Sequence, residues 1–197
     1  MPDSIIRMIE SFKMLPGIGE KTAERMAFSV LNFDDEQIDL FVNSLSDAKN
    51  KIKNCSVCNI LTENDVCNIC SDSGRNGNVL CVVDDVKNAF LFEKMGMFDG
   101  YYFVLSGLIS PMDGINPEDI GIEKLIDRIK NGNFKEIIFA FNPCIEADTT
   151  SMYIKRILDG YDIVFTRLAS GVPMGANMEY VDSLTLERAL NDRKLVE

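Results

Sequence analysis

The sequence predicts a multi-domain α+β protein with a helical N-terminal part, a cysteine-rich segment, an α/β domain with a mainly parallel sheet, and a C-terminal helical tail. Three observations predict this organisation. Apolar residues recur at helical spacing through roughly the first fifty residues, and four cysteines then fall within sixteen residues. After Gly77, apolar runs typical of buried strands alternate with helical stretches, which is the pattern of a parallel sheet covered by helices.

The N-terminal part is predicted to contain three helices. Their apolar positions lie at helical spacing over residues 4–12, from near residue 20, and over about residues 34–52. The segment Leu15-Pro16-Gly17-Ile18-Gly19 separates the first two helices, because proline and glycine end a helix. A helix, Pro-Gly-Ile-Gly and a second helix together form the pattern of a helix-hairpin-helix.

The glycine-rich turn is a candidate DNA contact. Glycines let the backbone approach a phosphate closely, and the free N–H groups at the start of the second helix would face that phosphate. Two basic residues one turn apart on the second helix could flank the same phosphate path. The candidate DNA-binding residues are therefore Gly17, Gly19, Lys21 and Arg25. The alternative is a simple helical hairpin whose basic side chains are only solvated.

The closely spaced cysteines predict a metal site. Cys55, Cys58, Cys67 and Cys70 form two Cys-x-x-Cys pairs separated by eight residues. Two such pairs let four thiolates converge on one Zn²⁺, and a chain without an export signal is expected to keep its cysteines reduced. Sulfur would fill all four coordination positions, so this zinc is predicted to be structural. The alternatives are two disulfides or four free thiols.

The segment that follows the loop at residues 74–77 is predicted to be the α/β domain. Buried-type apolar runs indicate strands at residues 79–83, 101–105, 136–141 and 162–165. Helical stretches lie near residues 86–95, 117–130, 149–158 and 183–191. In a parallel sheet the functional crevice lies at the carboxyl ends of the strands.

Acidic residues follow two of these predicted strands. Asp84 and Asp85 come after the first strand, and Glu146 and Asp148 come after the third. Clustered carboxylates at strand ends could bind Mg²⁺ for phosphoryl chemistry. The alternative, which we favour, is that they cap and stabilise the starts of the next helices.

Composition excludes several classes of protein. The chain has 197 residues and a formal charge of −11, which argues against a polycationic coat on nucleic acid. It contains no histidine, so Ser-His-Asp catalysis and histidine-ligated metals are excluded. No apolar run reaches the length of a membrane span and the N-terminus has no secretion signal, so a cytoplasmic location is expected.

Several long segments together resemble the RecR family of bacterial recombination mediators, over nearly the whole chain. They are, in chain order, Leu15-Pro-Gly-Ile-Gly-Glu-Lys-Thr-Ala-Glu-Arg25, the two cysteine pairs, Cys81-Val-Val-Asp84-Asp85-Val86, Val104-Leu-Ser-Gly-Leu-Ile-Ser-Pro-Met-Asp-Gly-Ile115, Asn142-Pro143, and Glu179-Tyr180-Val181-Asp182 before Leu186. These segments in this order are far more specific than any one motif.

The resemblance implies a division into domains and a set of partners. It implies a helix-hairpin-helix domain for DNA binding and oligomerisation at residues 1–53, a four-cysteine zinc finger at 54–78, a Toprim domain at 79–175 and a tail at 176–197. The tail is expected to help close a ring-like tetramer around DNA, with a dimer as the other expected state in solution. Proteins of this family work with RecO and RecF to load the recombinase RecA on single-stranded DNA. The expected partners are therefore DNA, RecO, RecF and further copies of the chain, with no membrane.

The Toprim resemblance comes with a change of chemistry. Catalytic Toprim domains present a Glu after the first strand and Asp-x-Asp after the third, where this chain has Asp84, Asn142 and Cys144. Losing two carboxylates removes the oxygen anions that Mg²⁺ prefers. We expect no enzyme activity, and we expect a docking surface for RecO at Asp84, Asp85, Glu146 and Asp148. The alternatives are a Toprim-type nuclease or primase-like enzyme using Asp84, Glu146 and Asp148, and a scaffold that binds only protein.

The negative charge is unevenly distributed. Residues 1–53 carry a net −2, residues 54–78 a net −2 and residues 79–197 a net −7. The acidic excess therefore lies in the predicted docking domain rather than in the predicted DNA-binding part. A ring that encircles DNA needs only a few local phosphate contacts, so we expect weak and salt-sensitive DNA affinity.

Overall fold

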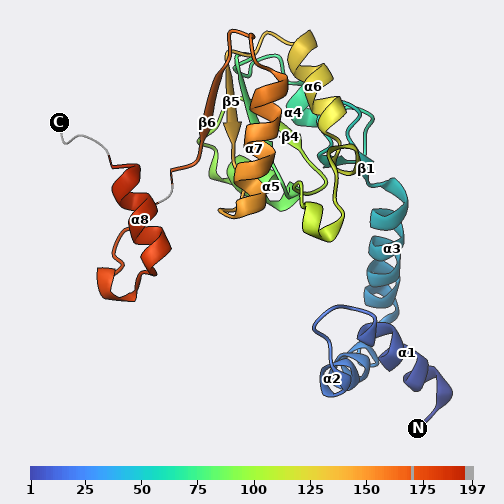
Figure 1. The fold of residues 1–197 in the computed structure, drawn as a ribbon. Helices are drawn as coiled ribbons and strands as arrows, with labels where there is room; N and C mark the ends of the chain where they lie inside the picture. The colour runs from blue at the N-terminus through green and yellow to red at the C-terminus, as the bar shows by residue number, and fades with distance from the viewer. Residues whose placement is uncertain (170, 194–197) are drawn as a thin grey trace. The chain divides into compact units, whose positions relative to one another are not determined.

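The computed structural model describes residues 1–169 and 171–193, and Figure 1 shows the course of the chain. The chain forms two compact units, residues 1–52 and residues 53–197. Each unit is described by itself below. Among the described residues, no helix has both the length and the apolar character needed to cross a bilayer.

The N-terminal unit consists of three helices, as the sequence predicts. They are α1 (Asp3–Lys13), α2 (Glu20–Val30) and α3 (Asp35–Lys51). A small core of Ile9, Ala23 and Ala27 holds α1 against α2. The helix α3 begins with a capping box, in which Asp34 accepts a hydrogen bond from the Gln37 backbone and the Gln37 side chain accepts one from the Asp34 backbone.

The cysteine-rich segment opens the second unit. Strands β1 (Lys53–Asn54) and β2 (Leu61–Thr62) form an antiparallel pair, and the short helix α4 (Asn68–Ser71) follows. These elements are too small to form a core of their own. They pack instead on the sheet that follows them in the chain.

A four-stranded parallel sheet lies at the centre of the second unit. Its strands are β3 (Val79–Val83), β4 (Tyr101–Val104), β5 (Glu136–Phe139) and β6 (Val164–Arg167), in the order β4-β3-β5-β6. All three neighbouring pairs are parallel, so the carboxyl ends of the strands share one edge. The predicted mainly parallel α/β architecture is confirmed.

The two faces of the sheet have different coverings, because side chains alternate along a strand. Leu80 and Val82 of β3 face the larger core, which is shared with α6 (Ile122–Asn131) and α7 (Ile145–Ile157). Cys81 and Val83 face a second core, which is shared with α5 (Val86–Met95) and the cysteine-rich segment. The zinc-finger cysteines thus belong to the same apolar core as one face of the sheet.

Two helix boundaries differ from those predicted. The helix expected at residues 117–130 is divided into a 3-10 helix at Pro117–Ile120 and α6, because Gly121 between them adopts a left-handed conformation with φ 78°. The helix expected from residue 149 begins at Ile145, directly after Pro143 and Cys144. Glu146 and Asp148 therefore lie in its first turn.

The C-terminal segment contains a short 3-10 helix at Met178–Tyr180 and then α8 (Ser183–Asn191). Asp182 caps α8 and accepts hydrogen bonds from the backbone N–H and the hydroxyl of Thr185. These bonds lower the pKa of Asp182.

Candidate zinc centre and nucleic-acid interface

The four predicted cysteine ligands come together. The sulfur atoms of Cys55, Cys58, Cys67 and Cys70 all lie within 4.8 Å of one another. Four sulfurs at about 2.3 Å from a tetrahedral zinc lie about 3.8 Å apart, so this cluster fits the ion. Within the described part of the chain, it is the one cluster of three or more His, Cys, Asp or Glu close enough to share a metal.

Local backbone geometry positions the sulfurs. The first cysteine pair turns at Asn59, which has a left-handed φ of 66°, and the Cys55 N–H donates to the Ile60 carbonyl at 2.7 Å. In the second pair, the Cys67 N–H points at the Cys55 sulfur at 3.3 Å and the Cys70 N–H at the Cys67 sulfur at 3.4 Å. Backbone donors aimed at sulfur stabilise thiolates.

The electrostatic environment favours the thiolate form at Cys70 but not at every ligand. A hydrogen bond with Cys58 lowers the pKa of Cys70 to about 6, and the positive charge of Arg128 acts in the same direction. The matching interaction with Cys70, together with burial, raises the pKa of Cys58. A site of four sulfurs with no exchangeable position holds a structural zinc, and Zn²⁺ supplies crosslinking rather than catalysis there.

The zinc finger is joined to the sheet by direct hydrogen bonds. The Val104 N–H donates to the Cys58 carbonyl at 2.9 Å, and the Asn59 side chain donates back to the Val104 carbonyl at 3.0 Å. These bonds extend the β4 edge of the sheet into the first cysteine pair.

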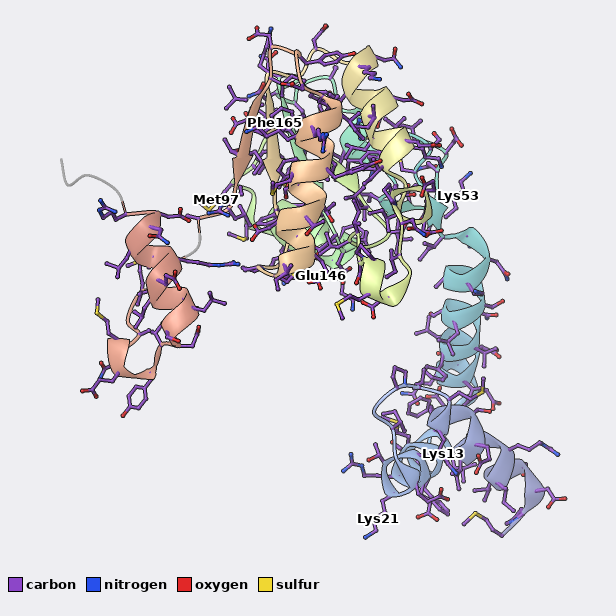
Figure 2. All side chains as sticks on the ribbon, viewed as in Figure 1. Lys13, Lys21, Lys53, Met97, Glu146 and Phe165 are labelled. Atoms are coloured by element: carbon purple, nitrogen blue, oxygen red, sulfur yellow. The ribbon has the colours of Figure 1, made fainter. Side chains whose placement is uncertain are left out.

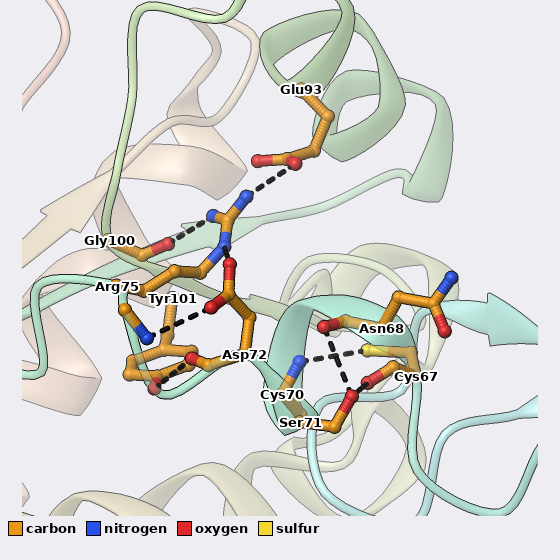
Figure 3. A network of polar contacts seen from close by, with 10 residues as sticks. Cys67, Asn68, Cys70, Ser71, Asp72, Arg75, Glu93, Gly100 and Tyr101 are labelled. Carbon is orange, nitrogen blue, oxygen red and sulfur yellow. Dashed lines mark hydrogen bonds and ion pairs between the residues drawn. The ribbon is translucent and has the colours of Figure 1, made fainter.

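A second junction surrounds Arg75, as Figure 3 shows. The guanidinium donates to the Gly100 carbonyl at 2.7 Å and forms an ion pair with Glu93 of α5. The Tyr101 hydroxyl donates to the Asp72 carbonyl at 2.9 Å, just beyond the second cysteine pair. The chain leaving the zinc finger is therefore fixed to both α5 and β4.

The predicted DNA-binding turn has the expected backbone geometry. Gly17 has φ 80°, a left-handed conformation that favours glycine, and the Ile18 N–H donates to the Leu15 carbonyl at 3.2 Å. Gly19 precedes α2 and offers no capping side chain, and the position where a Cβ would stand is open. The first N–H groups of α2 therefore have no side-chain cap and are accessible to an anion.

The predicted basic residues lie beside this turn. Lys21 and Arg25 are both exposed on α2, and Lys21 extends outward from the helix (Figure 2). Neither forms an ion pair with any residue that the structure describes. Lys13 differs, because Glu10 and Glu20 bind its ammonium at 2.8 and 2.7 Å and raise its pKa.

The acidic residues after β3 serve the following helix. Asp85 caps α5 by accepting a hydrogen bond from the Lys87 backbone N–H at 2.9 Å. Asp84 accepts a bond from the Asn88 side chain at 3.2 Å. Both line a shallow pocket of about 220 Å³ next to the first cysteine pair.

The acidic residues after β5 lie in a different environment. Asp148 is paired with two arginines, Arg167 at 3.5 Å and Arg188 of α8 at 3.4 Å. It lines a larger pocket of about 880 Å³ between the β5–α7 loop and the C-terminal segment, together with Asn142 and Cys144. Asp84 and Asp85 thus line one pocket and Asp148 lines the other, whereas Glu146, partly buried in the first turn of α7, lines neither of these two pockets.

Three arginines with evident roles were missed at the sequence level. Arg167 and Arg188 join the C-terminal segment to α7, and Arg128 of α6 reaches the zinc finger. No local pattern identifies them, because their partners lie 19 to 71 residues away in the chain.

Comparison with protein families gives a match for each part of the chain. Residues 5–49 match the model "RecR, helix-hairpin-helix", and residues 52–72 match the model of the RecR zinc finger domain with four cysteines. Residues 78–169 match "Toprim domain", and residues 171–194 match "RecR, C-terminal".

Individual relatives agree with the family models. The Recombination protein RecR of Staphylococcus haemolyticus (strain JCSC1435) is 47% identical over 192 residues, which cover 98% of this chain and 97% of that protein. The Recombination protein RecR of Staphylococcus aureus (strain Newman) gives the same identity and coverage. With its helix-hairpin-helix, its structural zinc finger and its Toprim domain in the family's order, the chain belongs to the RecR family of recombination proteins.

Proposed function

We propose that this chain is a DNA-binding mediator of recombinational repair. In this proposal it forms a ring-like clamp that acts with RecO and RecF to help load RecA on single-stranded DNA. Family membership supports the recombination role, and a bacterial repair protein of this kind is expected to work in the cytoplasm. The observation that carries the DNA-binding step is a pair of exposed cations, without an ion pair to any described residue, beside a helix N-terminus that has no side-chain cap.

The proposed DNA contact is made to the backbone. Gly17 and Gly19 leave room for a phosphate at the start of α2, where the helix dipole favours an anion. Lys21 and Arg25 follow at one-turn spacing and would neutralise phosphates along the strand. Such contacts do not read bases, so binding is expected to be independent of sequence.

The proposed ring requires contacts between copies of the chain. Within a single chain none of the residues of α3 is buried. The N-terminal unit exposes large apolar side chains on α2, α3 and the turn between them: Phe28, Leu31, Phe33, Leu40, Phe41, Val42 and Leu45. We assign this surface to a neighbouring copy, and a second contact between copies to the C-terminal tail.

The Toprim domain is proposed to bind a partner rather than to catalyse a reaction. Asn142 and Cys144 stand where catalytic Toprim domains carry carboxylates. Asp85 is engaged as a helix cap and Asp148 in ion pairs, which supports the structural use of these acids. We propose that RecO docks on the acidic surface formed by Asp84, Asp85, Glu146 and Asp148.

The DNA-binding step is tested by replacing both cations. The Lys21→Ala/Arg25→Ala protein should fold normally, because both side chains are exposed. Its affinity for a labelled oligonucleotide, measured by fluorescence anisotropy, should fall. The slope of log K against log salt concentration should decrease in magnitude by about 2 per bound subunit, one for each lost phosphate contact.

A matched control removes the same charge elsewhere. Lys87→Ala/Lys94→Ala takes two exposed cations from α5 and should leave the salt slope unchanged. Equal slopes for the wild type and the α2 variant would contradict the hairpin assignment.

The absence of enzyme activity is tested separately, by incubating the wild-type protein with supercoiled plasmid and Mg²⁺ or Mn²⁺, which should leave the plasmid intact. Nicking that disappears in Glu146→Ala would favour the enzyme instead.

A further inference from the structure

One side chain of the α/β domain reaches directly into the zinc finger. Arg128 lies on α6, yet its Nη2 is 3.7 Å from the sulfur of Cys70. Its Nη1 donates to the Val57 carbonyl in the first cysteine pair at 3.3 Å and to the Tyr102 carbonyl of β4 at 2.7 Å. A single guanidinium thus contacts both cysteine pairs and the sheet.

The guanidinium of Arg128 is oriented by contacts other than the one with the Cys70 sulfur. Its Cζ lies 5.9 Å from the ring centre of Tyr101 and 5.9 Å from that of Phe134. Aromatic faces attract the cation, and the short bond to Tyr102 fixes the direction of the planar fork. Arg128 is therefore preorganised, and little conformational freedom is lost when it donates to Cys70.

Cys70 is the ligand that most needs such a contact. Cys55, Cys58 and Cys67 are buried, whereas Cys70 is partly exposed. The most exposed of the four cysteine residues is thus the one whose sulfur the guanidinium contacts.

The charge of the metal centre makes the contact favourable. Four thiolates and one Zn²⁺ carry a net charge of −2. Residues 54–78 add a further net −2 from their side chains, so the cation that faces the sulfur comes from outside the zinc finger. A positive hydrogen-bond donor withdraws electron density from a bound thiolate and makes the sulfur less nucleophilic.

We infer that Arg128 is a positioning residue of the zinc centre, which docks the zinc finger on α6 and protects the Cys70 sulfur from electrophiles and from release of the metal. Cys70 is then the position at which the zinc centre opens when Arg128 is removed. This inference concerns the stability of the metal site and is independent of the proposed DNA clamp.

The test uses the zinc-loaded full chain and N-ethylmaleimide. The thiolate sulfur adds to the maleimide double bond, the zinc–sulfur bond breaks, and a proton from water completes the adduct. A metal-sensitive dye records zinc release, and peptide mass spectrometry identifies which cysteine is modified first. Arg128→Gln should release zinc roughly ten-fold faster than the wild type, with Cys70 as the first modified ligand.

Two further variants separate protection from general loss of structure. Lys130→Gln removes an exposed charge from the same helix, forms no contact with the described part of the zinc finger, and should behave as the wild type. Arg128→Lys keeps the charge but loses the planar fork, so its release rate should lie between the two. If Arg128→Gln does not fold, Arg128→Lys carries the test, again with Cys70 modified first.

Two results would overturn the inference. One is a release rate in both Arg128 variants equal to that of Lys130→Gln. The other is faster modification of all four cysteines together, without preference for Cys70, which a purely structural role of Arg128 would produce.

Discussion

Two cysteines outside the zinc centre illustrate how environment decides the chemistry of a residue. Cys81 is only 5% exposed, in the core between β3, α5 and the zinc finger, and burial raises its pKa to about 12. Cys144 is half-buried at the start of α7, on the wall of the larger pocket. The thiol of Cys81 is therefore inaccessible to reagents, whereas that of Cys144 is accessible.

The zinc-loaded protein should reveal this difference on mild alkylation. Iodoacetamide at pH 8 is expected to modify Cys144 and to leave Cys81 unmodified, as read by peptide mass spectrometry. Because its pKa is raised, Cys81 holds about one thiolate in ten thousand at pH 8, and raising the pH to 9 should still leave it protected. In Cys144→Ser no cysteine outside the zinc centre should react. Early labelling of Cys81 would show that its core opens readily.

Prediction from sequence succeeded for residues whose partners are near in the chain. Each Cys-x-x-Cys pair spans only four residues, so spacing alone identifies Cys55 and Cys58 as partners. Arg128 could not be found in this way, because its partner Cys70 lies 58 residues away in the chain and only the tertiary fold brings the two together. The ion pair between Asp148 and Arg188 could not be predicted for the same reason, because the two residues lie far apart in the chain.

At the scale of elements, α3 is a helix whose start is secured locally but whose apolar side has no cover in a single chain. The Asp34–Gln37 capping box closes its first turn, which supports a helix without tertiary packing. Val42 and Leu45 are 56% and 60% exposed. This combination fits a helix that completes its packing on another copy, as the proposed ring requires.

Charge placed on the apolar side of α3 should prevent assembly without unfolding the helix. Val42→Lys/Leu45→Lys is expected to lower the solution mass, measured by light scattering after gel filtration, toward that of one or two chains. Far-UV circular dichroism should stay unchanged, because neither side chain is buried in the single chain. Asn43→Lys/Asn50→Lys carries the same charge on the polar side of α3 and should keep the wild-type mass. A wild-type mass in both variants would place the interface elsewhere.

Element boundaries show what periodicity can and cannot resolve. Apolar spacing predicted one helix through residues 117–130, but Gly121 takes a left-handed conformation and divides it. Glycine tolerates both helical and left-handed backbone, so spacing alone cannot tell which it adopts. The strands were easier to predict, since buried parallel strands are short continuous apolar runs, as in Val79–Val83.

At the scale of the whole molecule, the metal belongs to one of the two units. Cys55, Cys58 and Cys67 share a core with β3, β4 and α5, all within residues 53–197. The core of α1 and α2 lies in the other unit and contains no cysteine. Zinc should therefore stabilise the second unit and have little effect on α1 and α2.

Removal of zinc should expose this division. Chelation is expected to lower the protection of backbone amides in β3, β4 and α5 from hydrogen exchange, as measured by mass spectrometry. The protection of α1 and α2 should stay as in the zinc-loaded protein, and adding zinc back should restore the rest. Equal loss of protection in both units would show that the metal stabilises the chain as a whole.

The hydrogen bonds that join Cys58 and Asn59 to Val104 also determine how this chain can be recombined with its relatives. A chimaera joined between residues 52 and 53 exchanges a complete packed unit and keeps the metal centre together with the sheet beneath it. A chimaera joined in the loop at residues 74–77 would instead combine the zinc finger of one parent with β4 and α6 of the other. The contacts between the zinc finger and these two elements would then be made by residues from different proteins. Although the zinc finger is small and has its own sequence motif, a functional chimaera should therefore take the zinc finger and the α/β domain from the same parent.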